Sequence, residues 1–296
     1  ACVRPPAIFP LQAAGVAPAV CRAALPRTRT IHPVSALDLP RPALIGVVHL
    51  LATPGAPRYG GAMEALLERA RADAEALARG GCDALLVENF GDAPYFPGQV
   101  PAETIAAMAV ALRVVRAVAG GLPVGVNVLR NDARGALGLC AATGASFLRV
   151  NVHTGVAVTD QGLVEGRAAE TLRERARLAP GVAILADVHV KHASPLGSRP
   201  IGEAARDALE RGLADALIVS GERTGVPPTQ ADLTQVRDAV GDATILVGSG
   251  LDPRNAALLL GLADGAIVGN FFKRDGRVDQ PVDLERVRSL RLHCPR

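Results

Sequence analysis

The densest group of titratable side chains in the chain is the run Asp187-Val-His-Val-Lys-His192. In an extended segment, Asp187, His189 and Lys191 alternate and therefore share one face. Asp187 could then orient His189, so that the imidazole acts as a general base near neutral pH. Lys191 could instead bind an anionic substrate or form a Schiff base, and the residues alone do not select between these roles.

Comparable side chains recur along the chain, each at or just after the end of a short apolar run. Singly they have structural explanations, because Asn favours turns and a lone His is often a core residue. Together they predict a functional surface, with His49, Glu88, Asp187 and His189 as catalytic candidates and Asn127, Asn151, His153, Lys191, Glu222 and Arg223 as substrate-binding candidates. The four catalytic candidates could also ligate a divalent metal. No other cofactor is indicated.

Two glycine-bearing turns predict a phosphate site. Val247-Gly-Ser-Gly250 and Val268-Gly-Asn270 each follow an apolar run. Glycine lets an anion approach the backbone N–H groups closely, because it has no side chain to block the approach. The predicted phosphate-binding residues are Gly248, Ser249, Gly250, Gly269 and Asn270.

Eight apolar runs of four to six residues alternate with amphipathic stretches from Leu44 onward, which is typical of buried parallel strands between helices. The predicted strands begin near Leu44, Ala84, Val124, Phe147, Ala183, Ala216, Thr244 and Gly265, and the predicted helices include Met63–Arg79, Ala102–Ala119, Asp132–Ala142, Ala168–Leu178, Glu203–Arg211 and Pro253–Leu262. This pattern predicts a (β/α)8 TIM barrel, and the family resemblance described below implies the ribulose-phosphate-binding type. In such a barrel the polar side chains meet at the C-terminal strand ends, and the glycine turns follow strands 7 and 8, where many barrels bind phosphate.

Composition excludes several classes of protein. The chain has 296 residues, of which 49% are hydrophobic and 21% charged, so it can bury a substantial core. No apolar run reaches the ~18 residues of a membrane-spanning helix. A net charge of +3, dispersed along the chain, does not favour a nucleic-acid partner. The five cysteines show no metal-ligand spacing, which indicates a reducing compartment such as the cytoplasm.

The N-terminal segment differs from the rest. No acidic residue precedes Asp38, whereas four arginines and six prolines do. We assign residues 1–41 to an N-terminal extension, 42–290 to the barrel domain and 291–296 to a tail. An acid-free, arginine-containing start resembles an organelle targeting peptide over residues 1–40, and a translated upstream or disordered extension is the alternative.

These motifs together resemble the BtpA/SgcQ family of predicted TIM-barrel proteins. The matching segments cover almost all of the chain from Pro42 to Gly276: Ile45–Leu50, Pro54–Tyr59, Gly81–Asn89, Val124–Asp132, Phe147–Asn151, Gln161–Gly166, Asp187–His192, Ser220–Gly225, Val247–Gly250, Ala263–Gly269 and Lys273–Gly276. Asn270-Phe-Phe272 departs from the small hydroxyl residue expected after Gly269, which places one phosphate donor in doubt.

The resemblance implies two functions. The wider family, found also in organisms without photosynthesis, is regarded as enzymes of the phosphate-binding barrel group with no settled reaction. One branch is associated with biogenesis or stability of photosystem I proteins, which implies a peripheral association with the thylakoid membrane. Some members are labelled phosphoribosylanthranilate isomerases, but such an isomerase uses a Cys at the end of strand 1, where this chain has His49.

The sequence thus favours an enzyme that binds a small phosphorylated metabolite and uses the His, Asp and Glu candidates for acid–base chemistry. An isomerase, an aldolase and a hydrolytic lyase all remain open. The alternative is a non-catalytic factor for assembly of a membrane protein complex. The crowded polar surface favours the enzyme, because a scaffold has no use for it.

Overall fold

Eight parallel strands form a closed barrel in the computed structural model, which describes residues 37–197 and 199–294. Around the barrel the order is β1, β2, β3, β4, β7, β9, β10 and β11, and β11 pairs with β1. Every predicted strand start lies within one residue of an observed one, so the predicted TIM barrel is confirmed. The strands are β1 (Ala43–His49), β2 (Ala84–Glu88), β3 (Val124–Asn127), β4 (Phe147–Val150), β7 (Ala183–Val188), β9 (Ala216–Val219), β10 (Ile245–Val247) and β11 (Gly265–Val268).

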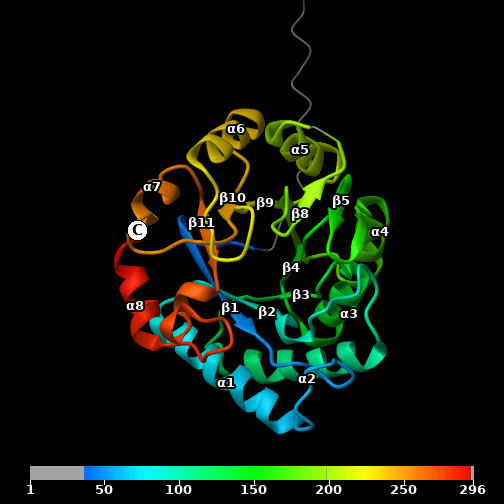
Figure 1. The fold of residues 1–296 in the computed structure, drawn as a ribbon, viewed down its shortest axis with the longest axis vertical. Helices are drawn as coiled ribbons and strands as arrows, with labels where there is room; N and C mark the ends of the chain where they lie inside the picture. The colour runs from blue at the N-terminus through cyan, green and yellow to red at the C-terminus, as the bar shows by residue number, and fades with distance from the viewer. Residues whose placement is uncertain (1–36, 198, 295–296) are drawn as a thin grey trace, which may run out of the picture. The chain divides into compact units, whose positions relative to one another are not determined.

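Helices surround the strands in a ring (Figure 1). They are α1 (Met63–Gly80), α2 (Ala102–Val118), α3 (Ala133–Thr143), α4 (Ala168–Leu178), α5 (Ile201–Arg206), α6 (Gln230–Val240), α7 (Ala256–Leu260) and α8 (Leu284–Leu292). The helix predicted over Glu203–Arg211 is α5 followed by a π-helical turn, and the one predicted over Pro253–Leu262 is the shorter α7. The prediction names no helix at α6 or α8.

The core has two layers, because alternate residues of each strand point to opposite sides of the sheet. Ile45, Val47 and Phe147 belong to the cluster inside the barrel. Leu44 and Val48 belong to the larger cluster that includes the buried faces of the helices. Inward-facing residues near the C-terminal strand ends are polar, and this change creates the site described below.

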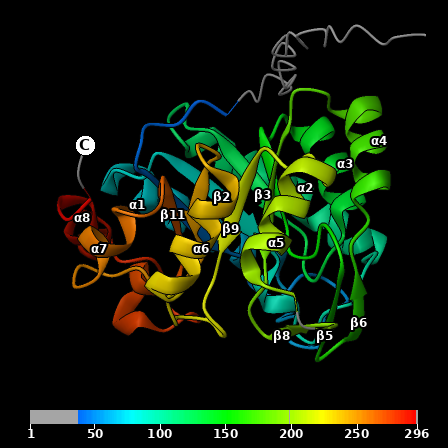
Figure 2. The same cartoon turned by 90° about the horizontal axis from the view of Figure 1, so that it is seen from above.

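The loops that follow β4 and β7 contain a second, antiparallel sheet. It consists of β6 (Gly162–Glu165), β5 (Val156–Thr159) and β8 (Ala193–Pro195), in that order. Figure 2 shows these strands grouped below α5. The sequence predicts only a long loop over 152–167, because the strands of this small sheet are short and mostly exposed and lack a continuous apolar run.

The ends of the described chain lie against the barrel. Leu37 and Leu39 pack on the inner cluster, although we assign them to the N-terminal extension. Likewise, α8 includes Arg291 and Leu292 of the assigned tail. Residues 1–36, with most of the predicted targeting segment, and residues 295–296 lie outside the described residues. Among those described, no helix is long and apolar enough to cross a membrane.

Candidate active site

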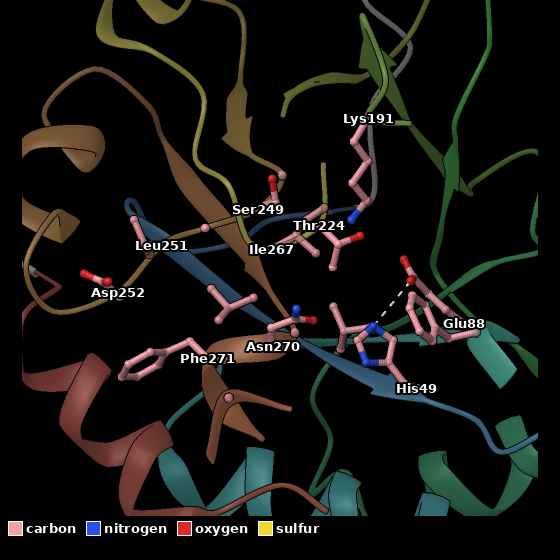
Figure 3. A pocket seen from close by; sticks show the side chains of 18 of the residues that line it. His49, Glu88, Lys191, Thr224, Ser249, Leu251, Asp252, Ile267, Asn270 and Phe271 are labelled. Atoms are coloured by element: carbon pink, nitrogen blue, oxygen red, sulfur yellow. Dashed lines mark ion pairs between the residues drawn. The ribbon is translucent and has the colours of Figure 1, made fainter. Parts of the chain in front are cut away.

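The main site is a pocket of about 230 Å³ at the C-terminal ends of the barrel strands, which we call the central pocket. Two groups of residues line it (Figure 3). The first, the charged wall, comprises His49, Glu88, Arg149 and Lys191. The second, the glycine wall, comprises Gly248, Ser249, Gly250, Gly269 and Asn270. All five predicted phosphate-binding residues are therefore in one place, together with three of the other candidates.

Arg149 connects the two acidic candidates of the site. From β4 its guanidinium Nε and one terminal nitrogen donate to both oxygens of Asp187 on β7, at 2.8 and 2.9 Å. Its other terminal nitrogen is 3.3 Å from Glu88 Oε1 on β2. All three side chains are buried. Burial alone would lower the pKa of Arg149, but the two carboxylates raise it, so the guanidinium is permanently charged.

Arg149 is not among the residues predicted from the sequence, although the sequence carries a signal for it. Phe147, Arg149 and Asn151 alternate, so an inward-facing Phe147 places Arg149 inward as well. A charge at an inner barrel position needs a partner, because an unpaired buried charge is costly. Asp187 and Glu88 are those partners.

The predicted substrate-binding roles of Asn127 and Asn151 are not supported by their positions. The Asn127 amide donates to Glu88 Oε1 at 3.2 Å, and the Asn151 amide donates to Asp187 Oδ2 at 2.9 Å. Neither residue lines the central pocket. Both amides instead hold carboxylates in place, as does Ser220, whose hydroxyl is 3.4 Å from Asp187 Oδ1.

His49, the last residue of β1, is a neutral imidazole at the pocket wall. Its Nε2 lies 3.7 Å from Glu88 Oε2, and its ring packs on Phe90 with centroids 4.5 Å apart. Burial, reinforced by the positive charges of Lys273 and Lys191, lowers the pKa of His49 well below its ordinary value. Nδ1 is buried and has no hydrogen-bond partner among the described residues. A neutral imidazole can both accept and donate a proton, so His49 and Glu88 form a compact acid–base pair.

Lys191 supplies an amine without a partner. Its side chain reaches the central pocket (Figure 3) and, within the described residues, makes no hydrogen bond or ion pair. Burial and the nearby Arg149 lower the pKa of Lys191 to about 8, against the opposing influence of Glu88 and Asp187. The backbone is fixed by Arg130, which donates to the Lys191 carbonyl at 2.6 Å.

The predicted pairing of Asp187 with His189 is wrong. Strand β7 ends at Val188, and His189 has φ of 51°, so the alternation that would place both side chains together stops there. The oxygens of Asp187 bond to Arg149, Asn151 and Ser220 instead. His189 lines a small pocket distinct from the central one, together with Asn151 and Asp187, but it makes no hydrogen bond to Asp187. Its predicted role as a base is untested, but this geometry does not favour it.

The divalent metal site proposed for the four catalytic candidates is not assembled. Within residues 37–197 and 199–294, no three His, Cys, Asp or Glu side chains are arranged to hold a metal. The physical reason is Arg149, whose guanidinium bonds to both Glu88 and Asp187 and supplies the positive charge that the metal would bring.

Three further candidates lie away from the central pocket. His153 is buried, and its Nε2 is 2.8 Å from the carbonyl of Gly212, which makes it a core histidine. Glu222 and Arg223 are exposed, whereas the next residues of the same loop, Thr224 and Gly225, reach the pocket. The predicted substrate-binding roles of His153, Glu222 and Arg223 are therefore not supported.

The glycine wall presents backbone donors. A Cβ at Gly248 would lie 2.2 Å from Ser220 Oγ, and one at Gly250, where φ is +72°, would lie 2.2 Å from the nitrogen of Pro227. Glycine is therefore required for the turn to pack. No acceptor among the described residues contacts the N–H groups of Ser249, Gly250 and Asn270. The Ser249 hydroxyl already donates to the Val226 carbonyl at 2.7 Å, so its backbone N–H, rather than its side chain, is free to donate.

Arg286 adds a positive charge beside the glycine wall, and neither this residue nor α8 is predicted from the sequence. Its Nε donates to the Phe271 carbonyl at 2.6 Å, and its guanidinium lies 4.5 Å from the centre of the Phe271 ring. The acidic Asp252 also lines the pocket, but Arg254 pairs with its carboxylate. The local balance of charge therefore favours an anion.

The buried histidines predict a pH-dependent stability. Burial lowers the pKa of both His49 and His153 in the folded protein. The unfolded chain binds protons at these residues below pH ~6.5, whereas the folded chain does not, so stability falls as the pH falls. We expect the urea midpoint to decrease from pH 7 to pH 5.5, and to decrease less in His153→Gln. Equal decreases in the two proteins would contradict the role of His153.

Comparisons with known proteins agree with this architecture. The model of the BtpA family matches residues 41–293. The photosystem I biogenesis protein BtpA of Synechocystis is 48% identical over 82% of this chain and 85% of its own length. An uncharacterized protein of Pyrococcus furiosus is 45% identical over 86% of this chain and 95% of its own.

Solved structures show the same fold at low sequence identity. An N-(5'-phosphoribosyl)anthranilate isomerase from Pyrococcus furiosus superimposes with a TM-score of 0.51 and 13% identity, covering 85% of this chain and 98% of its own. That likeness concerns the barrel alone. The family match and the identities to relatives go further: the chain belongs to the BtpA family.

Proposed function

We propose that this protein is an enzyme that binds a small phosphorylated metabolite in the central pocket. The phosphate contacts the glycine wall, and the reacting end faces the charged wall. The observation that carries this proposal is the presence of both walls in one pocket, with unpaired backbone N–H groups on one and a neutral imidazole beside a carboxylate on the other. Backbone donors suit a phosphate because their N–H groups can point at its oxygens.

The chemistry that fits the charged wall is proton transfer. Glu88 is oriented by Arg149 and Asn127, so its second oxygen faces His49. A proton taken from the substrate by Glu88 can be returned at another atom through His49. Isomerisation next to a carbonyl and carbon–carbon bond cleavage there are both promoted by such general acid–base catalysis.

The proposal is tested by thermal unfolding of the purified protein with a panel of sugar phosphates and inorganic phosphate. A ligand that binds only the folded state stabilises it by about 2.7 kcal/mol at a hundredfold excess over its dissociation constant. We expect phosphorylated compounds to raise the melting temperature and their unphosphorylated counterparts not to do so. If no phosphorylated compound raises it, the proposal fails.

Replacing Gly269 with Ala tests the role of the glycine wall. A Cβ at this position would lie 2.7 Å from His49 Cε1, at the meeting point of the two walls. The backbone of Gly269 has a negative φ of −114°, so the substitution does not place alanine in the left-handed region. We expect Gly269→Ala to fold and to lose at least tenfold in affinity for the sugar phosphate that stabilises the wild type.

Gly138→Ala is the matched control. Gly138 lies within α3, and a Cβ there would meet nothing within 4 Å. The variant should bind the sugar phosphate as the wild type does and gain a little stability from the better helix former. Unchanged affinity in Gly269→Ala would show that the phosphate does not bind at the glycine wall.

A second function, a non-catalytic factor for assembly of a membrane complex, is favoured by the 48% identity to a photosystem I biogenesis protein. Under this second proposal the protein acts in the cytoplasm and at the periphery of the thylakoid. The basic pair Lys273-Arg274 does not supply a membrane contact, because Lys273 is fully buried. Affinity capture of partners from solubilised thylakoids tests this second function. A non-catalytic factor does not need Glu88 for chemistry, so Glu88→Gln should capture the same partner as the wild type.

A further inference from the structure

The chain uses lysine at only two positions. Of its 32 lysines and arginines, Lys191 and Lys273 are the only lysines. Lys273 is buried, with its Nζ 2.6 Å from Asp73. Lys191 lines the central pocket and, in the part of the chain that the structure describes, has no side-chain partner. Wherever the remaining surface needs a positive charge, this chain uses arginine, so charge alone does not account for a lysine at the pocket.

A lysine amine can do what a guanidinium cannot. It can lose its proton near neutral pH and then act as a nucleophile, whereas arginine stays charged. The surroundings of Lys191 promote that loss, because burial and Arg149 bring its pKa from 10.5 to about 8. Nucleophilic lysines in enzymes are activated in the same two ways, by desolvation and by a neighbouring cation.

We propose that Nζ of Lys191 forms an imine with the carbonyl carbon of a phosphorylated aldehyde or ketone held in the central pocket. This inference rests on the proposed function and names its substrate class. The carbonyl-bearing end of the substrate contacts the charged wall while its phosphate contacts the glycine wall. It also assigns a nucleophile to a site in which the histidine and the carboxylates provide only proton transfer.

Imine formation at Lys191 conserves atoms and charge. The ammonium of Lys191 gives up one proton, and the freed lone pair forms the C–N bond as the carbonyl π bond opens onto oxygen. That oxygen receives the released proton and a second proton from nitrogen, and it leaves as water while C=N forms. The product iminium carries the same single positive charge as the starting ammonium. Glu88 and Asp187, which favour a positive charge at Nζ, therefore favour the iminium too.

Borohydride trapping tests the imine, because hydride reduces C=N to a stable secondary amine. The protein is incubated with glyceraldehyde 3-phosphate, dihydroxyacetone phosphate, ribose 5-phosphate or ribulose 5-phosphate, reduced, digested and measured by mass spectrometry. We expect the reduced adduct on Lys191, with Lys273 unmodified in the same digest. Labelling should increase from pH 6.5 to pH 8.5, as the amine loses its proton.

Two small molecules serve as matched controls. Glycerol 3-phosphate has the phosphate but no carbonyl, so it should compete with labelling without being trapped. Dihydroxyacetone has the carbonyl but no phosphate, so it should label Lys191 at least tenfold less than its phosphate. Equal labelling by both would overturn a phosphate-directed imine.

The variants Lys191→Arg and Lys191→Met distinguish imine formation from an effect of positive charge alone. Neither should be labelled at position 191, and both should still be stabilised by glycerol 3-phosphate, which reports on the glycine wall. A phosphorylated carbonyl compound that raises the melting temperature without labelling Lys191 overturns the imine and leaves the proposed function intact. If no compound raises the melting temperature and none labels, both proposals fail.

Discussion

Arg149→Met should lower the free energy of unfolding at pH 7 by about 3–5 kcal/mol, the usual cost of leaving a buried charge without its partner. The guanidinium bonds to both oxygens of Asp187 and to Glu88, and the side chains of all three are less than 7% exposed. Methionine fills a similar space but offers no donor, so two carboxylates remain buried. Urea unfolding followed by circular dichroism measures the loss.

The pH dependence of Arg149→Met identifies the cause. Protonation of a carboxylate relieves the unpaired charge, so the deficit relative to wild type should shrink between pH 7 and pH 5. The double variant Arg149→Met/Asp187→Leu should recover part of the loss, because it removes one of the stranded acids. A deficit below 1 kcal/mol, or one that is constant with pH, would show that Arg149 does not hold these carboxylates.

Arg149→Met also bears on Lys191, whose pKa Arg149 lowers. Without the guanidinium, the amine should keep its proton to higher pH. Borohydride labelling of a variant that remains folded should therefore require more alkaline solution than labelling of the wild type.

The barrel could be predicted from the sequence because its strands are covered on both sides. Each is a continuous apolar run, as in Ala84–Val87, and amphipathic segments separate the runs. The small sheet of β5, β6 and β8 could not be predicted in this way. Its strands are three or four residues long, and their pairing depends on the loop after β7 reaching β5 across the fold.

Within the site, the sequence predicts the location of a residue where its position in the chain alone fixes that location. The glycine turns follow the last two barrel strands, so their neighbourhood is set by the fold. Prediction fails where a contact depends on a single dihedral angle. At His189, φ of 51° ends the alternation of β7, and the oxygens of Asp187 bond to Arg149, Asn151 and Ser220 instead. The pocket arginines depend on tertiary partners, and Arg286 comes from a helix far along the chain.

Asp73→Ala should lower the free energy of unfolding by about 3–5 kcal/mol, because it strands the buried Lys273. Asp73 lies in α1 and accepts hydrogen bonds from Lys273 Nζ at 2.6 Å and from the Val282 backbone at 2.7 Å. These bonds tie both ends of the 273–282 segment to α1. The preceding turn, Asn270–Phe272, carries part of the glycine wall. The variant should therefore also bind the stabilising sugar phosphate more weakly.

The pH dependence of Asp73→Ala should run opposite to that of Arg149→Met. Burial lowers the pKa of Lys273, and Asp73 opposes that effect. Without Asp73 the folded chain holds Lys273 neutral, while the unfolded chain binds a proton below pH ~10.4. Stability of the variant therefore rises with pH, and its deficit should shrink between pH 7 and pH 9.5.

An exposed ion pair provides the control for Asp73→Ala. Glu285 pairs with Arg288 at 2.8 Å, with side chains 74% and 51% exposed. Glu285→Ala should change the free energy of unfolding by no more than about 0.5 kcal/mol, because water screens the pair. Similar losses in the two variants would mean that burial of Lys273 contributes nothing. A large loss of unfolding free energy in Asp73→Ala alone, relieved at alkaline pH, would identify the unpaired Lys273 amine as its cause. Weaker sugar-phosphate binding by the same variant would show that α1 supports the glycine wall.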